Sequence, residues 1–182
     1  KKLKNKYAIT GNFRSINKDY KFNLDIDKLV LDYQKWAVSQ DNYIQFGQSG
    51  IIVNQFQISN SGQSLSINSN PVKPNAPLTV DFKDFRLETL TKFAETDTTL
   101  IGGRINGTAN LKDLASNPKF EANLTIDQLR YQKDQLGTMR IAVNNNTANA
   151  FEINMALTGV HEIRANGFYY TKPNSALDLK VN

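Results

Sequence analysis

The segment GGRINGTANLKDLASNPKFEANLTI, which runs from Gly102 to Ile126, decides the fold class. Apolar or small residues take every second position from Ile101 to Leu111, and mostly polar residues take the positions between them. After the turn residues SNP, the same alternation runs from Phe120 to Asp127. A period of two is typical of β-strands with one buried and one solvated face. The segment predicts a β-hairpin with strands near residues 100–111 and 119–127.

The rest of the chain continues this pattern on both sides of the hairpin. Alternating runs are separated by the turn-forming segments NSGQS, NPVKPNAP, NNNTAN and TKPNS. One segment departs from it, because Leu87, Leu90 and Phe93 recur at helical spacing. We therefore expect an all-β chain, a curved antiparallel sheet of repeated hairpins shaped like a taco or gutter. One short helix, from Glu88 to Glu95, is expected to plug an edge or end of the sheet.

Two segments are close copies of one another. NLDIDKL begins at Asn23 and NLTIDQL begins at Asn123, and ALDLKVN at the end of the chain resembles the start of a third copy. Each copy follows a strand that begins near a glycine and then a polar turn. The copies predict a repeated hairpin unit stacked along an axis, with a strand of the form L-x-I-D-x-L.

Composition excludes several classes of function. The 182 residues carry a net charge of +5 that is spread along the chain, apart from the opening KKLKNK, so we expect no nucleic-acid partner. The absence of cysteine excludes disulfides and thiolate chemistry. No apolar run is long enough for a membrane helix. The first residue is not Met and the last residues lie within an alternating run, so residues 1–182 are expected to form one β-rich segment of a longer protein.

No catalytic or metal-binding constellation is found. GGRING lacks the spacing of a phosphate-binding or dinucleotide-binding glycine loop, and glycines within a strand more often mark a bend or a close approach of backbones. The single histidine, His161, cannot build a common zinc site without cysteine. Asp25 and Asp27 lie too close together for a calcium loop and are read as a solvated strand face. The sequence therefore predicts no enzyme activity, no cofactor and no metal.

What remains is the apolar strand face, for which two interpretations stay open. If the sheet closes on itself or packs on a second sheet, this face is ordinary core. If the sheet stays open, the face is a larger apolar surface than soluble proteins normally expose, and it suits lipid acyl chains. Strand parity assigns its lining to the following residues: Ile101, Ile105, Ala109, Leu111, Phe120, Leu124, Ile126, Met139, Ile141, Val143, Phe151, Ile153, Met155 and Leu157.

The same segment resembles a known family. A strand of the form G-x-x-x-G-x-A-x-L, then N-P-x-F and a strand L-x-I, runs from Gly103 through Asn117 and Pro118 to Ile126, and an L-G step follows at Leu136 and Gly137. These motifs resemble the C-terminal region of TamB-type translocation and assembly proteins, especially the versions found in Bacteroidetes. The likeness is clearest over residues 78–182.

The resemblance implies a setting and a role. TamB-type proteins belong with the AsmA-like, bridge-like lipid transfer proteins, are anchored at the inner membrane and span the periplasm with a bent, taco-like sheet. The expected partners are then phospholipid acyl chains and, through the parent protein, an outer-membrane barrel of the TamA or BamA type. The implied function is non-enzymatic transport of phospholipid between the two membranes, or assistance to outer-membrane protein assembly. The resemblance supplies no catalytic residues.

Two further interpretations assign the chain to other functional classes. A β-sandwich adhesin or carbohydrate-binding module of the cell envelope would carry its function in polar loops and exposed aromatic residues, and only Phe168 to Tyr170 hint at that. A glycan-cleaving enzyme would need acidic and basic residues grouped on one strand face, and no such group is found.

Overall fold

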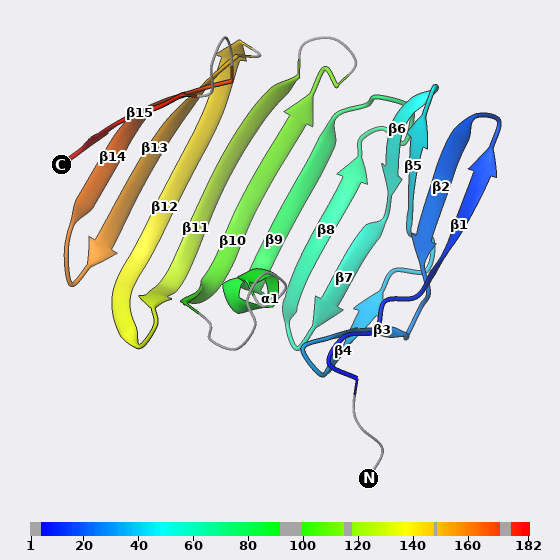
Figure 1. Cartoon of the computed structure of the whole chain (residues 1–182), viewed down its shortest axis with the longest axis horizontal. Helices are drawn as coiled ribbons and strands as arrows, with labels where there is room; N and C mark the ends of the chain where they lie inside the picture. Colours follow the sequence, from blue (N-terminus) through cyan, green and yellow to red (C-terminus); the bar gives the residue numbers. More distant parts are fainter. Residues whose placement is uncertain (1–4, 92–99, 115–117, 148, 172–175) are drawn as a thin grey trace.

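The protein is an antiparallel all-β chain with one short helix, as the alternation predicts (Figure 1). A computed structural model describes residues 5–91, 100–114, 118–147, 149–171 and 176–182. The N-terminal strands are β1 (Gly11–Ile16), β2 (Asp19–Leu24), β3 (Leu29–Leu31), β4 (Gln34–Val38), β5 (Tyr43–Gly47), β6 (Gly50–Asn54), β7 (Phe56–Asn60) and β8 (Gln63–Ser69). The remaining elements are β9 (Leu78–Arg86), α1 (Leu87–Thr91), β10 (Ile101–Lys112), β11 (Lys119–Tyr131), β12 (Asp134–Thr147), β13 (Ala150–Gly159), β14 (Ile163–Tyr170) and β15 (Ala176–Val181).

The strands form two sheets. The long sheet has eleven strands in the order β15-β14-β13-β12-β11-β10-β9-β8-β7-β4-β3, and the small sheet has the order β1-β2-β5-β6. From β7 to β15 every strand pairs with its neighbour in sequence, so this part of the long sheet is a simple meander of hairpins. The two edge strands, β15 and β3, do not pair with one another, so the sheet stays open.

The hairpin expected from the opening segment is confirmed. Its strands are β10 and β11, in continuous register from Asn106 opposite Thr125 to Lys112 opposite Lys119. The predicted helix begins as expected, with α1 over Leu87–Thr91, but residues 92–95 lie outside the described residues. The alternation of Ile52, Asn54, Phe56 and Ile58 does not belong to one strand. Gln55, with a φ of +43°, separates β6 from β7, and these strands belong to different sheets.

Two β-bulges keep the apolar residues on one face of the long sheet. In β9, two residues lie between Phe82 and Phe85 where only Asn106 lies between their partners in β10, and Asp84 takes a φ of +48°. In β11, Gln128 with a φ of +52° is the extra residue between Ile126 and Leu129. An extra residue reverses the parity of a strand, so Phe85 and Leu129 return to the apolar face despite their spacing of three.

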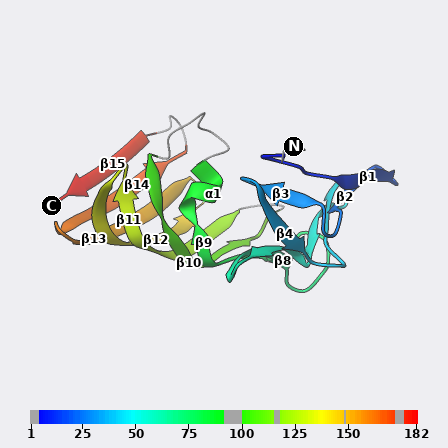
Figure 2. The same ribbon diagram turned by 90° about the horizontal axis from the view of Figure 1, so that it is seen from below.

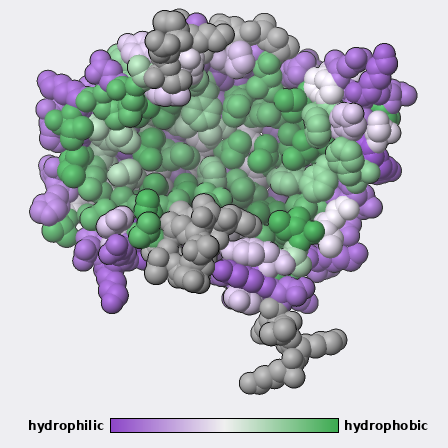
Figure 3. All heavy atoms as spheres, viewed as in Figure 1, coloured by the Kyte–Doolittle hydropathy of each residue, from purple (hydrophilic) through white to green (hydrophobic). Residues whose placement is uncertain are grey.

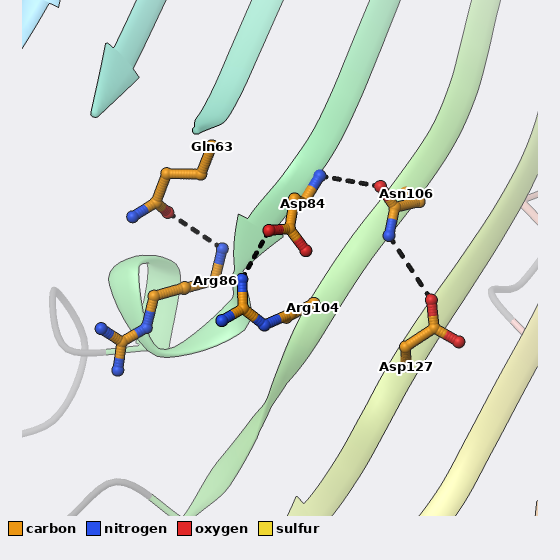
Figure 4. A network of polar contacts seen from close by, with 6 residues as sticks. All are labelled: Gln63, Asp84, Arg86, Arg104, Asn106 and Asp127. Carbon is orange, nitrogen blue, oxygen red and sulfur yellow. Dashed lines mark hydrogen bonds and ion pairs between the residues drawn. The ribbon is translucent and has the colours of Figure 1, made fainter. Parts of the chain in front are cut away.

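The polar groups around the β9 bulge are satisfied by side chains (Figure 4). The backbone N–H of Asp84 leaves the ladder and donates to Oδ1 of Asn106 at 2.7 Å, and Asp84 forms an ion pair with Arg104. Asn106 in turn donates to Asp127 at 3.5 Å, and the backbone N–H of Arg86 donates to Gln63 at 3.1 Å. The bulge is therefore a stable feature, because its freed N–H has a partner.

Both L-x-I-D-x-L copies bend near their second shared aliphatic residue, one position apart, and neither is a straight strand. In the second copy the bend is the bulge of β11, which buries Leu129. In the first copy Asp27 takes a φ of +61°, β2 ends at Leu24, and Leu29 starts β3 as a buried residue. The expectation of one continuous strand in each copy is wrong for the first copy.

The first prediction concerns Gly107, which has a φ of +125° and lies against β11. A Cβ at this position would stand 2.1 Å from the carbonyl oxygen of Asn123. Gly62, with a φ of +86°, has nothing within 4 Å of the same virtual atom. We expect Gly62→Ala to lower the free energy of unfolding by about 1 kcal/mol, from backbone strain alone. Gly107→Ala should lower it by at least about 2 kcal/mol more, because the collision with β11 adds to the strain. Urea unfolding of both variants measures the difference, and equal costs would contradict it.

The second prediction concerns pH. Asp19 accepts hydrogen bonds from the backbone N–H of Ser49 and the side chain of Gln45, both at 3.0 Å. The hydrogen bonds of Ser49, first among the causes, lower the pKa of Asp19 below its ordinary value of 3.8. A lowered pKa stabilises the folded state above the unfolded value, and this contribution is lost as the pH falls through the folded value.

Comparison with Asp19→Asn isolates this effect. The difference in unfolding free energy between the wild type and this variant should shrink as the pH falls from about 5 toward about 1. Urea unfolding at several pH values measures it. A difference that stays constant over this range would contradict the assignment.

Candidate functional site

Backbone register lines up the apolar residues of neighbouring strands in rows that cross the long sheet. Directly opposite residues of an antiparallel pair lie on the same face, so each pairing joins two side chains of one row. The central row takes one residue from each of ten strands, in the order Val181, Ala165, Met155, Ile141, Leu124, Gly107, Phe82, Leu65, Ile58 and Val38. The upper row is Leu179, Gly167, Ile153, Val143, Ala122, Ala109, Val80, Ile67 and Phe56. The lower row is Ile163, Leu157, Met139, Ile126, Ile105 and Phe85.

One end of this face is covered by the N-terminal part of the chain. Leu24, Leu29, Leu31, Trp36 and Val38 form a buried cluster with Phe85, and Phe56, Ile58, Leu65 and Phe82 pack against it. Figure 2 shows β3 and α1 on the same side of the long sheet. The rows therefore run beneath the N-terminal strands at this end, where the apolar face is ordinary core.

A second cover lies over the lower row. Ile105, Ile126, Leu129 and Leu157 form a buried cluster, and Leu87 of α1 packs against it. The helix thus covers the lower side of the face near β9 and β10, which are central strands of the long sheet and not its open edges.

Between these covers the apolar face is open. Ile141, Val143, Ile153 and Met155 are only partly buried, although each has apolar neighbours on both adjacent strands. Figure 3 shows the result as a broad hydrophobic surface framed by hydrophilic residues. Among the residues that the structure describes, no second sheet packs on β11 to β14. We call this surface, formed by the three rows from β10 to β15, the apolar trough.

Aromatic side chains mark the upper end of the trough. The rings of Phe120 and Phe151 lie 6.3 Å apart, and those of Phe151 and Tyr169 are also 6.3 Å apart. Phe151 and Tyr169 are direct partners in the β13–β14 ladder. These rings continue the apolar surface beyond the upper row.

The structure brings the candidate lining residues together on β10 to β13, but with unequal exposure. Ile105, Ala109, Ile126 and Leu157 are buried, and Ile101 is 40% exposed at the end of β10. Leu111, Phe120, Leu124, Met139, Ile141, Val143, Phe151, Ile153 and Met155 are partly buried. The four buried residues contribute little accessible surface, and the partly buried residues supply most of it.

Strand parity missed the residues beyond the bulges. Phe85 is 1% exposed and Leu129 is 6% exposed, and both lie on the apolar face of the long sheet although their parity in the sequence is opposite to that of Phe82 and Ile126. A signal was present, because F-K-D-F and I-D-Q-L both space two apolar residues by three with an aspartate between them. Leu87 was assigned to the helix without a contact, and it packs on the lower cluster.

The structure adds no chemical group to this apolar surface. Within the described ranges, no three His, Asp or Glu side chains gather as metal ligands, and His161 is exposed. No helix of the described chain has the length and apolar character needed to cross a membrane. Comparisons with protein-family models, with curated proteins and with solved structures found no match to this chain. The resemblance to TamB-type proteins therefore stays a prediction from the sequence.

Because the trough is covered in one part and open in another, the same substitution should lower the free energy of unfolding by different amounts at two of its positions. Ile126 is 8% exposed within the lower cluster, so Ile126→Asp buries an unpaired charge and should cost at least about 3 kcal/mol, enough to unfold a marginal domain. Ile153 lies in the open part, where an aspartate reaches water, and Ile153→Asp should cost about 1 kcal/mol. Thermal and urea unfolding measure both. Equal destabilisation would show that the trough around Ile153 is covered.

Proposed function

We propose that the apolar trough binds the acyl chains of phospholipids and conducts them across the strands. One observation carries the proposal: the central and upper rows remain apolar from strand to strand and are open to the exterior between β11 and β14. Soluble proteins rarely expose a large contiguous apolar surface unless it binds something apolar.

The dimensions of the rows suit an acyl chain lying across the strands. Neighbouring strands lie about 4.8 Å apart, and one leaflet of a bilayer contributes about 15 Å of hydrocarbon, so one chain spans about three strands. Each buried methylene contributes about 0.8 kcal/mol, so the affinity arises without a specific polar contact. The rows from β10 to β15 are longer than one chain, so there is room for movement along them.

The composition of the rows favours sliding over fixed binding. The central row from Val181 to Val38 and the upper row from Leu179 to Phe56 contain only apolar residues and glycine. A lipid tail that moves by one strand exchanges one aliphatic contact for another and breaks no hydrogen bond. Glycine or alanine at Gly107, Gly167, Ala109 and Ala122 leaves space beside the larger aliphatic side chains.

The cellular role follows from the resemblance and is proposed on that ground. The chain acts as a non-enzymatic groove segment of a periplasmic, inner-membrane-anchored protein that moves phospholipid between the inner and outer membranes. In the related role, assistance to outer-membrane protein assembly, a barrel of the TamA or BamA type is the partner of the parent protein. The β-sandwich architecture of the alternative, an adhesin or carbohydrate-binding module, requires a second sheet on β11 to β14, which the described residues do not form.

Photocrosslinking tests the proposal. We would place benzoylphenylalanine at Val143, in the upper row, or at Asn144, the next residue, whose side chain points to the opposite face. With phospholipid vesicles, ultraviolet light should attach lipid to the chain with the probe at Val143, and mass spectrometry should detect the adduct. The matched probe at Asn144 should give little adduct because it does not reach the trough.

A blocking variant separates tail binding from adventitious contact. Ile153 is the direct partner of Val143 in the ladder, and Ile153→Asp places a charge beside the probe. This substitution should reduce the crosslink by at least about tenfold, because a desolvated carboxylate opposes binding of an acyl chain. Equal labelling at both probe positions, or labelling unaffected by the aspartate in a folded variant, would refute the proposal.

A further inference from the structure

A second surface lies on the opposite, polar face of the same strands. A hollow of about 640 Å³ is lined by residues of β10 to β14. Its lining includes pairs two residues apart on neighbouring strands, among them Asn123 with Thr125 and Arg140 with Ala142. Residues two apart share one face of a strand, and these pairs have the parity opposite to that of the trough residues. The hollow therefore opens on the polar face, away from the trough.

Small residues between long ones create this hollow. One polar row contains Thr125, Arg140, Ala156 and Arg164 on four neighbouring strands. The two arginines thus lie two strands apart, about 9.5 Å between backbones, with only a methyl group between them. In the next row Ala142 is the small residue between the longer side chains of Asn123 and Asn154. Alanines form the floor, and the arginine and asparagine side chains form the walls.

The charge of the hollow is positive and uncompensated. Within the described ranges neither Arg140 nor Arg164 has a carboxylate partner, whereas Arg104 pairs with Asp84 and Arg130 pairs with Glu88. No acidic residue lines the hollow.

The border of the hollow carries charges of both signs. Lys180 is the direct partner of Asn166 at the margin of the hollow. Two acidic groups lie at its border: Glu152 accepts a hydrogen bond from Asn154 at 3.4 Å, and Asp127 accepts one from Asn106 at 3.5 Å. Both arginines are exposed, and an anion between them would meet two donors with planar, forked geometry.

The asparagines add a second kind of recognition. Asn123, Asn154 and Asn166 occupy one polar row beside the arginines. Each amide offers both donors and an acceptor, which matches the hydroxyl groups of a sugar. The volume lies within the range of about 300–1,000 Å³ typical of small-ligand sites. No aromatic side chain lines the hollow to stack a nucleotide base, which argues against nucleic acid as its ligand.

We propose that this hollow binds an anionic saccharide. Its carboxylate or phosphate lies between Arg140 and Arg164 above Ala156, and its hydroxyls meet the amides of Asn123, Asn154 and Asn166. The site is on the opposite face from the trough and does not depend on lipid binding.

The test uses four probes with the whole chain: an oligogalacturonate, glucose 6-phosphate, a neutral oligogalactose and inorganic phosphate. Isothermal titration or amide chemical shifts should show binding of at least one acidic saccharide, with clearly weaker binding of the neutral one. Arg140→Ala and Arg164→Ala should each weaken that binding by at least about tenfold, because each removes a charge-assisted contact. The control Arg14→Ala removes an exposed arginine from the small sheet and should leave binding unchanged.

Asparagine variants distinguish a saccharide site from a simple anion site. Asn154→Ala should weaken binding of the acidic saccharide and leave that of inorganic phosphate unchanged. Circular dichroism of each variant checks the fold. The proposal is overturned if the neutral sugar binds as tightly, if the two arginine variants behave like Arg14→Ala, or if inorganic phosphate binds as tightly as the sugar phosphate. Whether the carboxylate or the phosphate probe binds better identifies the acidic group.

Discussion

The hydrogen-bonded register between neighbouring strands is the constraint on which the other features depend. A shift of one residue at any pairing would turn the apolar side chains of that strand to the opposite face. The register from β9 to β15 instead places Leu124 opposite Ile141 and Ile141 opposite Met155, so apolar residues meet across every ladder. Bulges at Asp84 and Gln128 preserve this arrangement where the sequence spacing changes from two to three. Without them, Phe85 and Leu129 would face water on the polar side.

The same alternation gives the sheet two chemically distinct working surfaces. The trough has aliphatic side chains and no fixed charge, so it favours guests that are driven in by loss of water from apolar area. The polar hollow behind it holds Arg140 and Arg164 near amide groups, so it favours guests that bring charge and hydrogen-bonding groups. Each strand contributes side chains to both surfaces, so a bend in its backbone changes the shape of both. Gly107 belongs to the central row, and its backbone also borders the hollow.

Much of the fold was predictable because its signal is local. The β10–β11 hairpin, the all-β class and the shared face of residues such as Ile105, Leu124 and Ile153 follow from period two and turn residues. The start of the helix follows from the helical spacing of its apolar residues. The break at Gln55 and the burial of Phe85 and Leu129 did not follow from parity. Each involves a residue with positive φ that is neither glycine nor asparagine, so residue type gave little warning. The polar hollow was also missed, because Arg140 and Arg164 are 24 residues apart, and only the pairing of three strands brings them together.

The sequence by itself determined which side chains share a face within an unbroken strand, because alternation along an extended strand fixes that within a few residues. Tertiary structure alone decided where that face is covered and where it is open. The N-terminal strands bury Trp36 and Phe85 at one end, α1 covers the lower row, and the surface around Val143 and Ile153 stays accessible. Such cover depends on contacts between segments far apart in the chain. A pattern of period two contains no information about those contacts, so it cannot distinguish a core from a trough.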